Sequence, residues 1–335
     1  MTATGIGSMP GGDVLASEDD NAREYAEAVR VVLGELPDFA HLPELPGRGA
    51  GASMTGRALA LVTELGVDLQ PAGWRLTGSG SGIDHRRARS LLGRDLDVFE
   101  EHAQGLAGPV KVQVCGPWTL AATVEKPRGD KVLADHGARR ELAEALALGV
   151  ADHVADMRRR VPGATEIVVQ VDEPALPAVL AAQVPTASGF GKHRAIHPPE
   201  ASGALETVLS AVTGAGATPV VHCCAGEVPV DLIRGAGARG VAVDLAALRA
   251  SAYDGVAAAL EAGERVLLGV VPTLDPATSL TDKAVADKAL RFLDMLGLEP
   301  VPGLVLTPGC GLAGASPAWA RRALELVASA SKHLR

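Results

Sequence analysis

Aromatic residues, cysteines and long apolar runs are all scarce in this chain. Phe, Trp and Tyr together make up 3% of its 335 residues, whereas 47% of the residues are hydrophobic. The core must therefore be built from Val, Leu, Ala and Ile, which is typical of the layered interior of an α/β barrel. No window reaches the roughly 18 uninterrupted apolar residues of a membrane helix, because the alanine-rich stretches carry regular charges. We expect a soluble protein that does not enter a membrane.

The cysteine usage and the charge exclude further classes of protein. Four cysteines, two of them adjacent, do not form a disulfide framework in a chain of this length. No charged segment followed by an apolar one opens the sequence, so we expect a protein of the reducing cytoplasm. The formal net charge is −9, and Lys and Arg form no stripe interleaved with aromatic residues. We therefore expect small-molecule ligands and no nucleic-acid partner.

Short runs rich in β-branched residues alternate with longer runs of helical period along most of the chain. This alternation is typical of parallel strands joined by crossover helices. In chain order, the predicted strands are Thr2–Gly7, Asp38–Leu42, Val110–Val114, Ile167–Val171, Thr218–Cys223, Gly240–Leu245, Arg265–Val271 and Gly303–Thr307. Eight is the number of strands that closes a barrel. The sequence therefore predicts an α/β fold, a single (β/α)8 TIM barrel domain over residues 1–335.

The predicted helices carry apolar residues at intervals of three and four. They include Asn21–Leu36, Ser53–Leu65, Gly137–Arg160, Glu200–Gly214 and Ser279–Leu296. The gap between the second and third strands is too long for one helix, and Val67–Thr77 predicts a hairpin inserted there. The Gly78–Gly82 run that follows is predicted to be a flexible connector, because it lacks the Lys-Ser or Lys-Thr of a phosphate-binding loop.

Polar residues follow several predicted strands, and in a parallel barrel all these strand ends share the rim that holds the active site. His222 and Cys224 point to the same side of an extended strand, whereas Cys223 faces the other way and is predicted to pack in the core. Taken alone, such a pair is weak evidence for a metal site, because a packed cysteine and a hydrogen-bonded histidine are the commoner interpretation. Cys310, after the last strand, adds a third zinc ligand. Asp244 is either a fourth ligand or a helix N-cap.

The motifs of this chain resemble, in the same order, those of the cobalamin-independent methionine synthases, in particular their C-terminal catalytic barrel. That family holds zinc by a His-x-Cys pair, a carboxylate on the next strand and a distant Cys-Gly-Leu, and the matching residues here are His222, Cys224, Asp244 and Cys310. The family carboxylate is usually Glu, so Asp244 is one methylene shorter. Further family motifs are matched by Ile6–Pro10, Gly116–Leu120 and Gln170–Ala175.

The resemblance implies a Zn²⁺-dependent methyltransferase that acts on the thiol of homocysteine, since coordination to zinc deprotonates a thiol and keeps it nucleophilic. An amino-acid acceptor also needs partners for its carboxylate and its ammonium group. We expect the Gly7 amide and the Ser8 hydroxyl to bind the carboxylate. Asp172, the predicted catalytic residue, and Glu44 are expected to bind the ammonium. The resemblance supports Ser8 and Asp172, whereas Glu44 is assigned from its position.

Other readings of these residues stay open. Full-length family enzymes carry a second, N-terminal barrel that helps bind a polyglutamylated folate, and this chain resembles the short, single-barrel relatives. The methyl donor is therefore either a methylfolate or a methylated corrinoid, the latter with a corrinoid protein as a partner. The barrel superfamily also includes uroporphyrinogen decarboxylases and corrinoid methyltransferases, and a non-catalytic zinc- or thiol-binding barrel is a further alternative. Structurally, Gly7–Ser8 could form only a turn and Asp172–Pro174 only a helix cap.

Four more ring side chains lie near the predicted rim or in polar stretches. Trp118 is expected to cover the rim rather than to stack on a pterin. His85, His193 and His197 are expected to be solvated.

Overall fold

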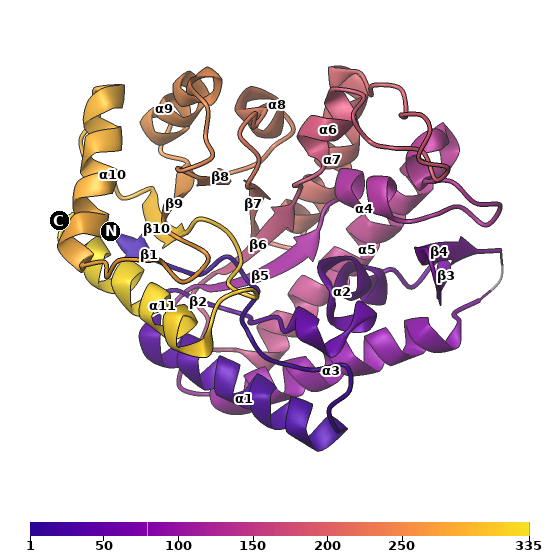
Figure 1. Ribbon diagram of the computed structural model, residues 1–335, viewed down its shortest axis with the longest axis horizontal. Helices are drawn as coiled ribbons and strands as arrows, with labels where there is room; N and C mark the ends of the chain where they lie inside the picture. The colour runs from indigo at the N-terminus through magenta and orange to yellow at the C-terminus, as the bar shows by residue number, and fades with distance from the viewer. Residues whose placement is uncertain (79, 335) are drawn as a thin grey trace.

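A computed structural model describes residues 1–78 and 80–334, arranged around a parallel sheet (Figure 1). Ser79, in the predicted connector, lies outside the described residues. The sheet strands are β1 (Thr2–Ala3), β2 (Ala40–His41), β5 (Val110–Cys115), β6 (Ile167–Asp172), β7 (Thr218–Cys223), β8 (Gly240–Asp244), β9 (Arg265–Val271) and β10 (Leu304–Pro308). They pair in parallel in the order β1-β10-β9-β8-β7-β6-β5-β2, so the eight strands of the predicted barrel are confirmed.

The two edge strands of this curled sheet meet at its carboxyl end. Ser8 and Glu44 form a parallel bridge in which the Met9 amide donates to the Glu44 carbonyl at 2.8 Å and the Glu44 amide donates to the Gly7 carbonyl at 3.2 Å. The first strand is shorter than predicted. Its pairing with β10 ends at Ala3. At Gly7 the backbone instead accepts a hydrogen bond from Glu44, which follows β2.

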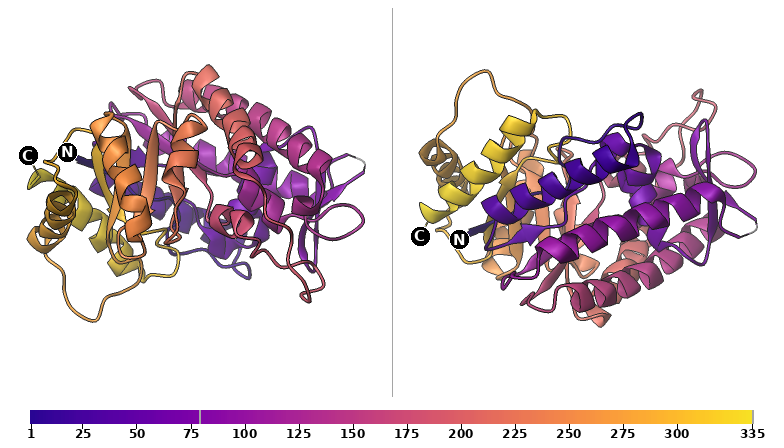
Figure 2. Two further views of the ribbon diagram at one scale, coloured as in Figure 1. Left: turned by 90° about the horizontal axis from the view of Figure 1, so that it is seen from above. Right: turned by 90° about the horizontal axis from the view of Figure 1, so that it is seen from below.

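Helices surround the sheet on its outer side, as the views from above and below show (Figure 2). They are α1 (Glu18–Glu35), α2 (Met54–Leu61), α3 (Ile83–His102), α4 (Pro117–Thr123), α5 (His136–Arg160), α6 (Leu176–Leu180), α7 (Pro198–Gly214), α8 (Val230–Gly235), α9 (Tyr253–Glu261), α10 (Asp282–Leu296) and α11 (Pro317–Lys332). Ser and Thr side chains cap several of them by accepting a hydrogen bond from a first-turn amide, as at Ser53 and Thr281. The helix predicted to reach Leu65 ends at Leu61, because the next residues lead into the hairpin.

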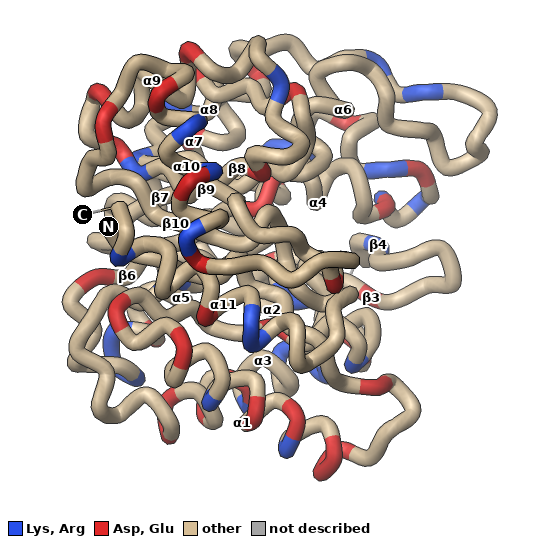
Figure 3. The backbone as a smooth tube through the Cα atoms, turned by 60° about the vertical axis from the view of Figure 1, so that its left-hand side comes forward, with Lys and Arg blue, Asp and Glu red and all other residues tan. Residues whose placement is uncertain are grey.

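The predicted insertion is a two-stranded antiparallel hairpin of β3 (Gly66–Gln70) and β4 (Gly73–Thr77). It projects from the barrel between α2 and α3 (Figure 1). Both signs of charge are interspersed over the outer helices (Figure 3). Within the described part of the chain, no helix is both long and apolar enough to cross a membrane.

The barrel interior changes from apolar to polar along the strands. Its lower part is an aliphatic cluster with one aromatic ring, formed by Ile6, Phe39, Val168, Val220, Ala242, Leu267 and Val305. Two and four residues further toward the carboxyl ends, the inward positions become polar, with Gln170 and Asp172 on β6 and His222 on β7. This gradient places hydrogen-bonding side chains directly beneath the rim.

Close approach of α5 to the end of α2 depends on a glycine. A Cβ built on Gly149 would lie 2.2 Å from the Leu61 carbonyl oxygen, whereas one built on exposed Gly203 in α7 meets nothing within 4 Å. We expect Gly149→Ala to lower the free energy of unfolding by about 1–3 kcal/mol. The control Gly203→Ala should raise it by about 0.5–1 kcal/mol. Denaturant unfolding measures both, and equal effects of the two changes would contradict the packing described.

Candidate metal centre

Three side chains that could hold a metal converge at the rim from strands that are not neighbours. His222 is the penultimate residue of β7, Cys224 follows the end of that strand, and Cys310 lies in the loop after β10. One potential ligand atom from each lies within 4.8 Å of the others. The Cys310 Sγ is 3.6 Å from the His222 Nε2. The convergence that the sequence pattern required is therefore present in the fold.

The ring of His222 is oriented for metal binding by its own hydrogen bond. Its Nδ1 lies 3.2 Å from the carbonyl oxygen of Ala242 on the adjacent strand β8. Because a carbonyl oxygen can only accept, Nδ1 carries the hydrogen, which leaves the lone pair on Nε2, the nitrogen that faces Cys310. A backbone carbonyl behind a ligating histidine is a common way to fix its tautomer in metal sites. One imidazole and two thiols are donors that suit Zn²⁺.

The two thiols of the centre differ from the other two cysteines. The neighbouring side chains of Cys310 and His222, chiefly a hydrogen bond from the Cys310 thiol, lower the pKa of Cys224 to about 4. The pKa of Cys310 is raised, because it holds the proton shared with Cys224. Burial raises the pKa of Cys223 to about 12 and that of Cys115 well above its ordinary value. Only the half-buried pair at the rim therefore carries a thiolate near neutral pH.

Asp244 ends β8, but the structure does not bring it into the group of three ligands. Its Oδ1 accepts a hydrogen bond from the Ala246 amide at 2.9 Å, which is a local turn interaction. The carboxylate lies against Gly309, where an added Cβ would have no room. It also faces Lys288, whose pKa is lowered by burial and raised by Asp244.

The segment Gly7–Ser8 lies beside the metal-ligand loop. The Leu312 amide donates to the Ser8 carbonyl at 2.8 Å. Gly311, which follows Cys310, packs so closely on the Ser8 hydroxyl that no side chain fits between them. Ser8 therefore anchors the loop that carries Cys310, and the structure brings Gly7 and Ser8 to the same part of the rim as the three ligands.

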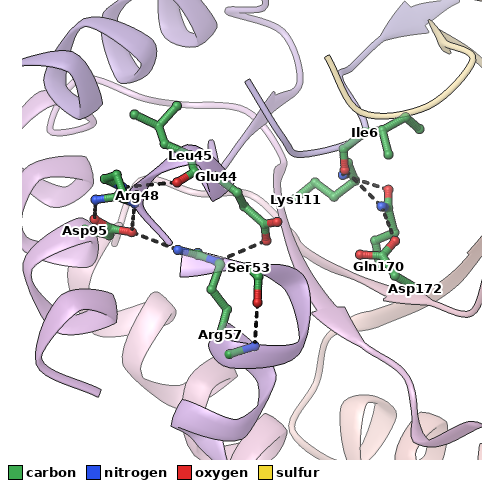
Figure 4. A network of polar contacts seen from close by, with 11 residues as sticks. Ile6, Glu44, Leu45, Arg48, Ser53, Arg57, Asp95, Lys111, Gln170 and Asp172 are labelled. Atoms are coloured by element: carbon green, nitrogen blue, oxygen red, sulfur yellow. Dashed lines mark hydrogen bonds and ion pairs between the residues drawn. The ribbon is translucent and has the colours of Figure 1, made fainter. Parts of the chain in front are cut away.

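Two buried carboxylates face the interior beneath this segment (Figure 4). Asp172 pairs in register with His222 and accepts a hydrogen bond from the Gln170 Nε2 at 2.7 Å. Burial raises the pKa of Asp172 to about 7. Glu44 is 3.2 Å from the Arg57 Nε, and burial raises its pKa while Arg57 lowers it. Glu44 also raises the pKa of Asp172, so the two charges lie near each other.

Two buried basic side chains near the candidate site, Arg57 and Lys111, were missed in the sequence. Arg57 is held by Asp95 at 2.8 Å, and Asp95 in turn binds Arg48. Lys111 is fully buried on β5. A lysine between two valines in an apolar run was the sequence feature that could have indicated it. Glu173 accepts hydrogen bonds from the Trp118 and Thr119 amides and so caps α4. Of the two adjacent acids, Glu173 therefore caps a helix and Asp172 faces the barrel interior.

Two of the histidine expectations are wrong. His85 is fully buried and its Nε2 bonds the Leu59 carbonyl at 2.9 Å, and His193 is buried beside Asp130. His197 is exposed, as expected. Trp118 is buried, and its indole nitrogen donates to the Ala201 carbonyl at 2.8 Å.

Comparisons with known proteins agree with this geometry. A family model described as the catalytic domain of cobalamin-independent synthases matches residues 99–333. A search of curated proteins gives no match. Among solved structures, a B12-independent methionine synthase from Shewanella sp. W3-18-1, in complex with selenomethionine, has a TM-score of 0.66 at 15% identity, over 99% of this chain and 97% of that one. A 3-keto-D-glucoside 4-epimerase from E. coli has a TM-score of 0.45 at 11% identity, over 98% and 99%.

The pKa values predict selective alkylation of the metal-free protein. At pH 6, above the pKa of Cys224 and below those of the other thiols, iodoacetamide should modify Cys224 first. Added Zn²⁺ should protect it, because metal ligation occupies the thiolate. Peptide mass spectrometry after timed quenching identifies the site. Equal rates at Cys224 and Cys223, or no protection by Zn²⁺, would contradict the arrangement of the centre.

Proposed function

Because the chain belongs to the family of cobalamin-independent synthase catalytic domains, we propose that it is a zinc-dependent methyltransferase that methylates the thiol of homocysteine to give methionine. The observation that carries this proposal is the convergence of His222, Cys224 and Cys310. A hydrolytic zinc enzyme typically uses nitrogen and oxygen ligands to activate water, whereas two thiolates leave the metal less positive and suit thiol chemistry. The selenomethionine bound to the Shewanella relative supports an amino acid as the ligand.

His222, Cys224 and Cys310 are the proposed ligands of the metal, and three protein ligands leave a position for an exchangeable one. When bound, zinc lowers the pKa of a coordinated thiol, so that the substrate sulfur is a thiolate at neutral pH. The Ala242 carbonyl holds the His222 ring in the tautomer that this requires. Asp244 is proposed as a fourth ligand only from the resemblance, since its carboxylate bonds its own turn.

The remaining polar groups are proposed to bind the amino-acid end of homocysteine. The Gly7 amide and the Ser8 hydroxyl receive the carboxylate, and Asp172 and Glu44 receive the ammonium group. Arg57 contacts the Glu44 Oε1 and Gln170 contacts the Asp172 Oδ1, so each carboxylate keeps a second oxygen for the substrate. Charge-assisted bonds of this kind are roughly twice as strong as neutral ones and so favour an α-amino acid over a simple thiol. Asp172, the nearest of the two acids to His222 in the sheet, is the proposed catalytic residue.

The methyl donor is proposed to be a small molecule, either a methylfolate or a methylated corrinoid. Both carry an electrophilic methyl group, on nitrogen or on cobalt, that a thiolate can attack. A cytoplasmic location agrees with the requirement of the centre for reduced thiols.

Methionine formation by the zinc-loaded protein tests the proposal. Homocysteine is supplied with methyltetrahydrofolate, its polyglutamates or methylcobalamin, and we expect turnover with at least one donor. Cys224→Ser and Cys310→Ser should each lower the rate by at least about 100-fold, because loss of a ligand typically abolishes a catalytic metal site. The control Cys223→Ala, a change in the core, should keep its zinc and most of its activity. Turnover that is independent of zinc, or unaffected by Cys224→Ser, would refute the proposal.

A further inference from the structure

Lys111 places a charged amine inside the barrel, below the proposed substrate site. It is fully buried on β5, and its Nζ donates to the Ile6 carbonyl at 2.8 Å and to the Gln170 Oε1 at 2.8 Å. The Gln113 amide is oriented so that its nitrogen donates to the Leu42 carbonyl. Its oxygen then accepts a third hydrogen bond from the Lys111 Nζ, at 2.8 Å. All three hydrogens of the ammonium group are therefore used by neutral acceptors (Figure 4 shows the contacts to Ile6 and Gln170).

The carbonyl of Ile6 is fixed from two sides. It accepts from the Lys111 Nζ and also from the Gln170 Nε2 at 2.9 Å, which fills both of its lone pairs. The peptide that joins Ile6 to Gly7 is planar and trans, so a carbonyl that points down to Lys111 aims the Gly7 amide the opposite way. Neither the Gly7 nor the Ser8 amide has an acceptor among residues 1–78 and 80–334. Two free amides next to the Cys310 loop suit a carboxylate.

Gln170 connects the same lysine to the other end of the site. Its Oε1 accepts from Lys111, and its Nε2 donates both to the Ile6 carbonyl and to the Asp172 Oδ1. The position of the Asp172 carboxylate is therefore tied to the position of the Gly7 amide through two side chains. The separation between the proposed carboxylate and ammonium receptors depends on this bridge.

The charge of Lys111 is balanced by the carboxylates above it. Burial lowers its pKa to about 7, and the nearby Asp172 and Glu44 act in the opposite direction. His41, whose pKa is lowered by burial and by Lys111, lies on the β2 side. Lys111 donates no hydrogen bond to His222, Cys224 or Cys310, because its three donor hydrogens all bond acceptors below the rim.

From these contacts we infer that Lys111 is a positioning residue that sets the spacing of the α-carboxylate and α-ammonium receptors, and so makes the site selective for α-amino acid thiols over simple thiols. This inference rests on the proposed function. It assigns Lys111 no contact with the substrate, and it predicts an effect on recognition of the amino-acid end alone.

The test compares two ligands on the zinc-loaded protein by calorimetry. Homocysteine carries the thiol with both charged groups, and 1-propanethiol carries the thiol alone. We expect Lys111→Met to weaken homocysteine binding by about 10- to 100-fold and to leave 1-propanethiol binding and zinc content unchanged. The control Lys131→Met removes a lysine that bonds the Thr123 carbonyl outside the barrel and should change neither affinity.

Gln170→Met breaks the hydrogen bonds that join Lys111, the Ile6 carbonyl and Asp172, without removing a buried charge. This variant replaces Lys111→Met in the test if Lys111→Met does not fold. It should show the same selective loss. Equal weakening of both ligands, or no weakening of homocysteine, would overturn the inference. If the wild-type protein binds homocysteine no better than 1-propanethiol, the proposed function itself fails, which is distinct from a failure confined to the variants.

Discussion

The closure of a parallel sheet between β1 and β2 determines where the functional side chains of this chain lie. All eight strands point the same way, so their carboxyl ends form one rim. Within the described residues β1 and β2 do not pair with each other, and the backbone bridge of Ser8 with Glu44, just beyond the two strands, joins these edges. The same Ser8 accepts the Leu312 amide, which draws the loop after β10 inward. Cys310 thereby reaches His222, although their strands are three positions apart in the sheet.

Below this rim the buried charges alternate in sign. The carboxylates of Glu44, Asp95 and Asp172 are interleaved with the cations of Arg48, Arg57 and Lys111. Such groups are tolerated in a low-dielectric interior only when each has partners, and removing one leaves its neighbour uncompensated. These buried charges therefore hold one another in place. Within residues 1–78 and 80–334, the second carboxylate oxygens of Glu44 and Asp172 and the amides of Gly7 and Ser8 have no hydrogen-bond partner, and these are the groups proposed to bind the two charged ends of an amino acid.

Much of this architecture could be predicted from the sequence. The period of β-branched runs located β7 and β9 to the residue, because central strands of a parallel barrel are buried on both faces. The convergence of His222, Cys224 and Cys310 was predicted from strand-end motifs. The short β1 could not be predicted, since it depends on contacts between distant segments. For Asp244 the sequence left a zinc ligand and a helix N-cap open, and its carboxylate bonds the Ala246 amide in a local turn. Lys111 was missed because its partners come from the segment after β1, from β5 and from β6, which only the closed barrel brings together.

This rim is proposed to bind a metal through two thiolates and one imidazole and to present it to the sulfur of homocysteine. X-ray absorption at the zinc K-edge of the purified, zinc-loaded protein tests it most directly. We expect a coordination shell with two sulfur ligands, from Cys224 and Cys310, and nitrogen or oxygen for the rest. Addition of homocysteine should replace a light atom by a third sulfur. A shell without sulfur, or a spectrum that homocysteine does not change, would contradict the account.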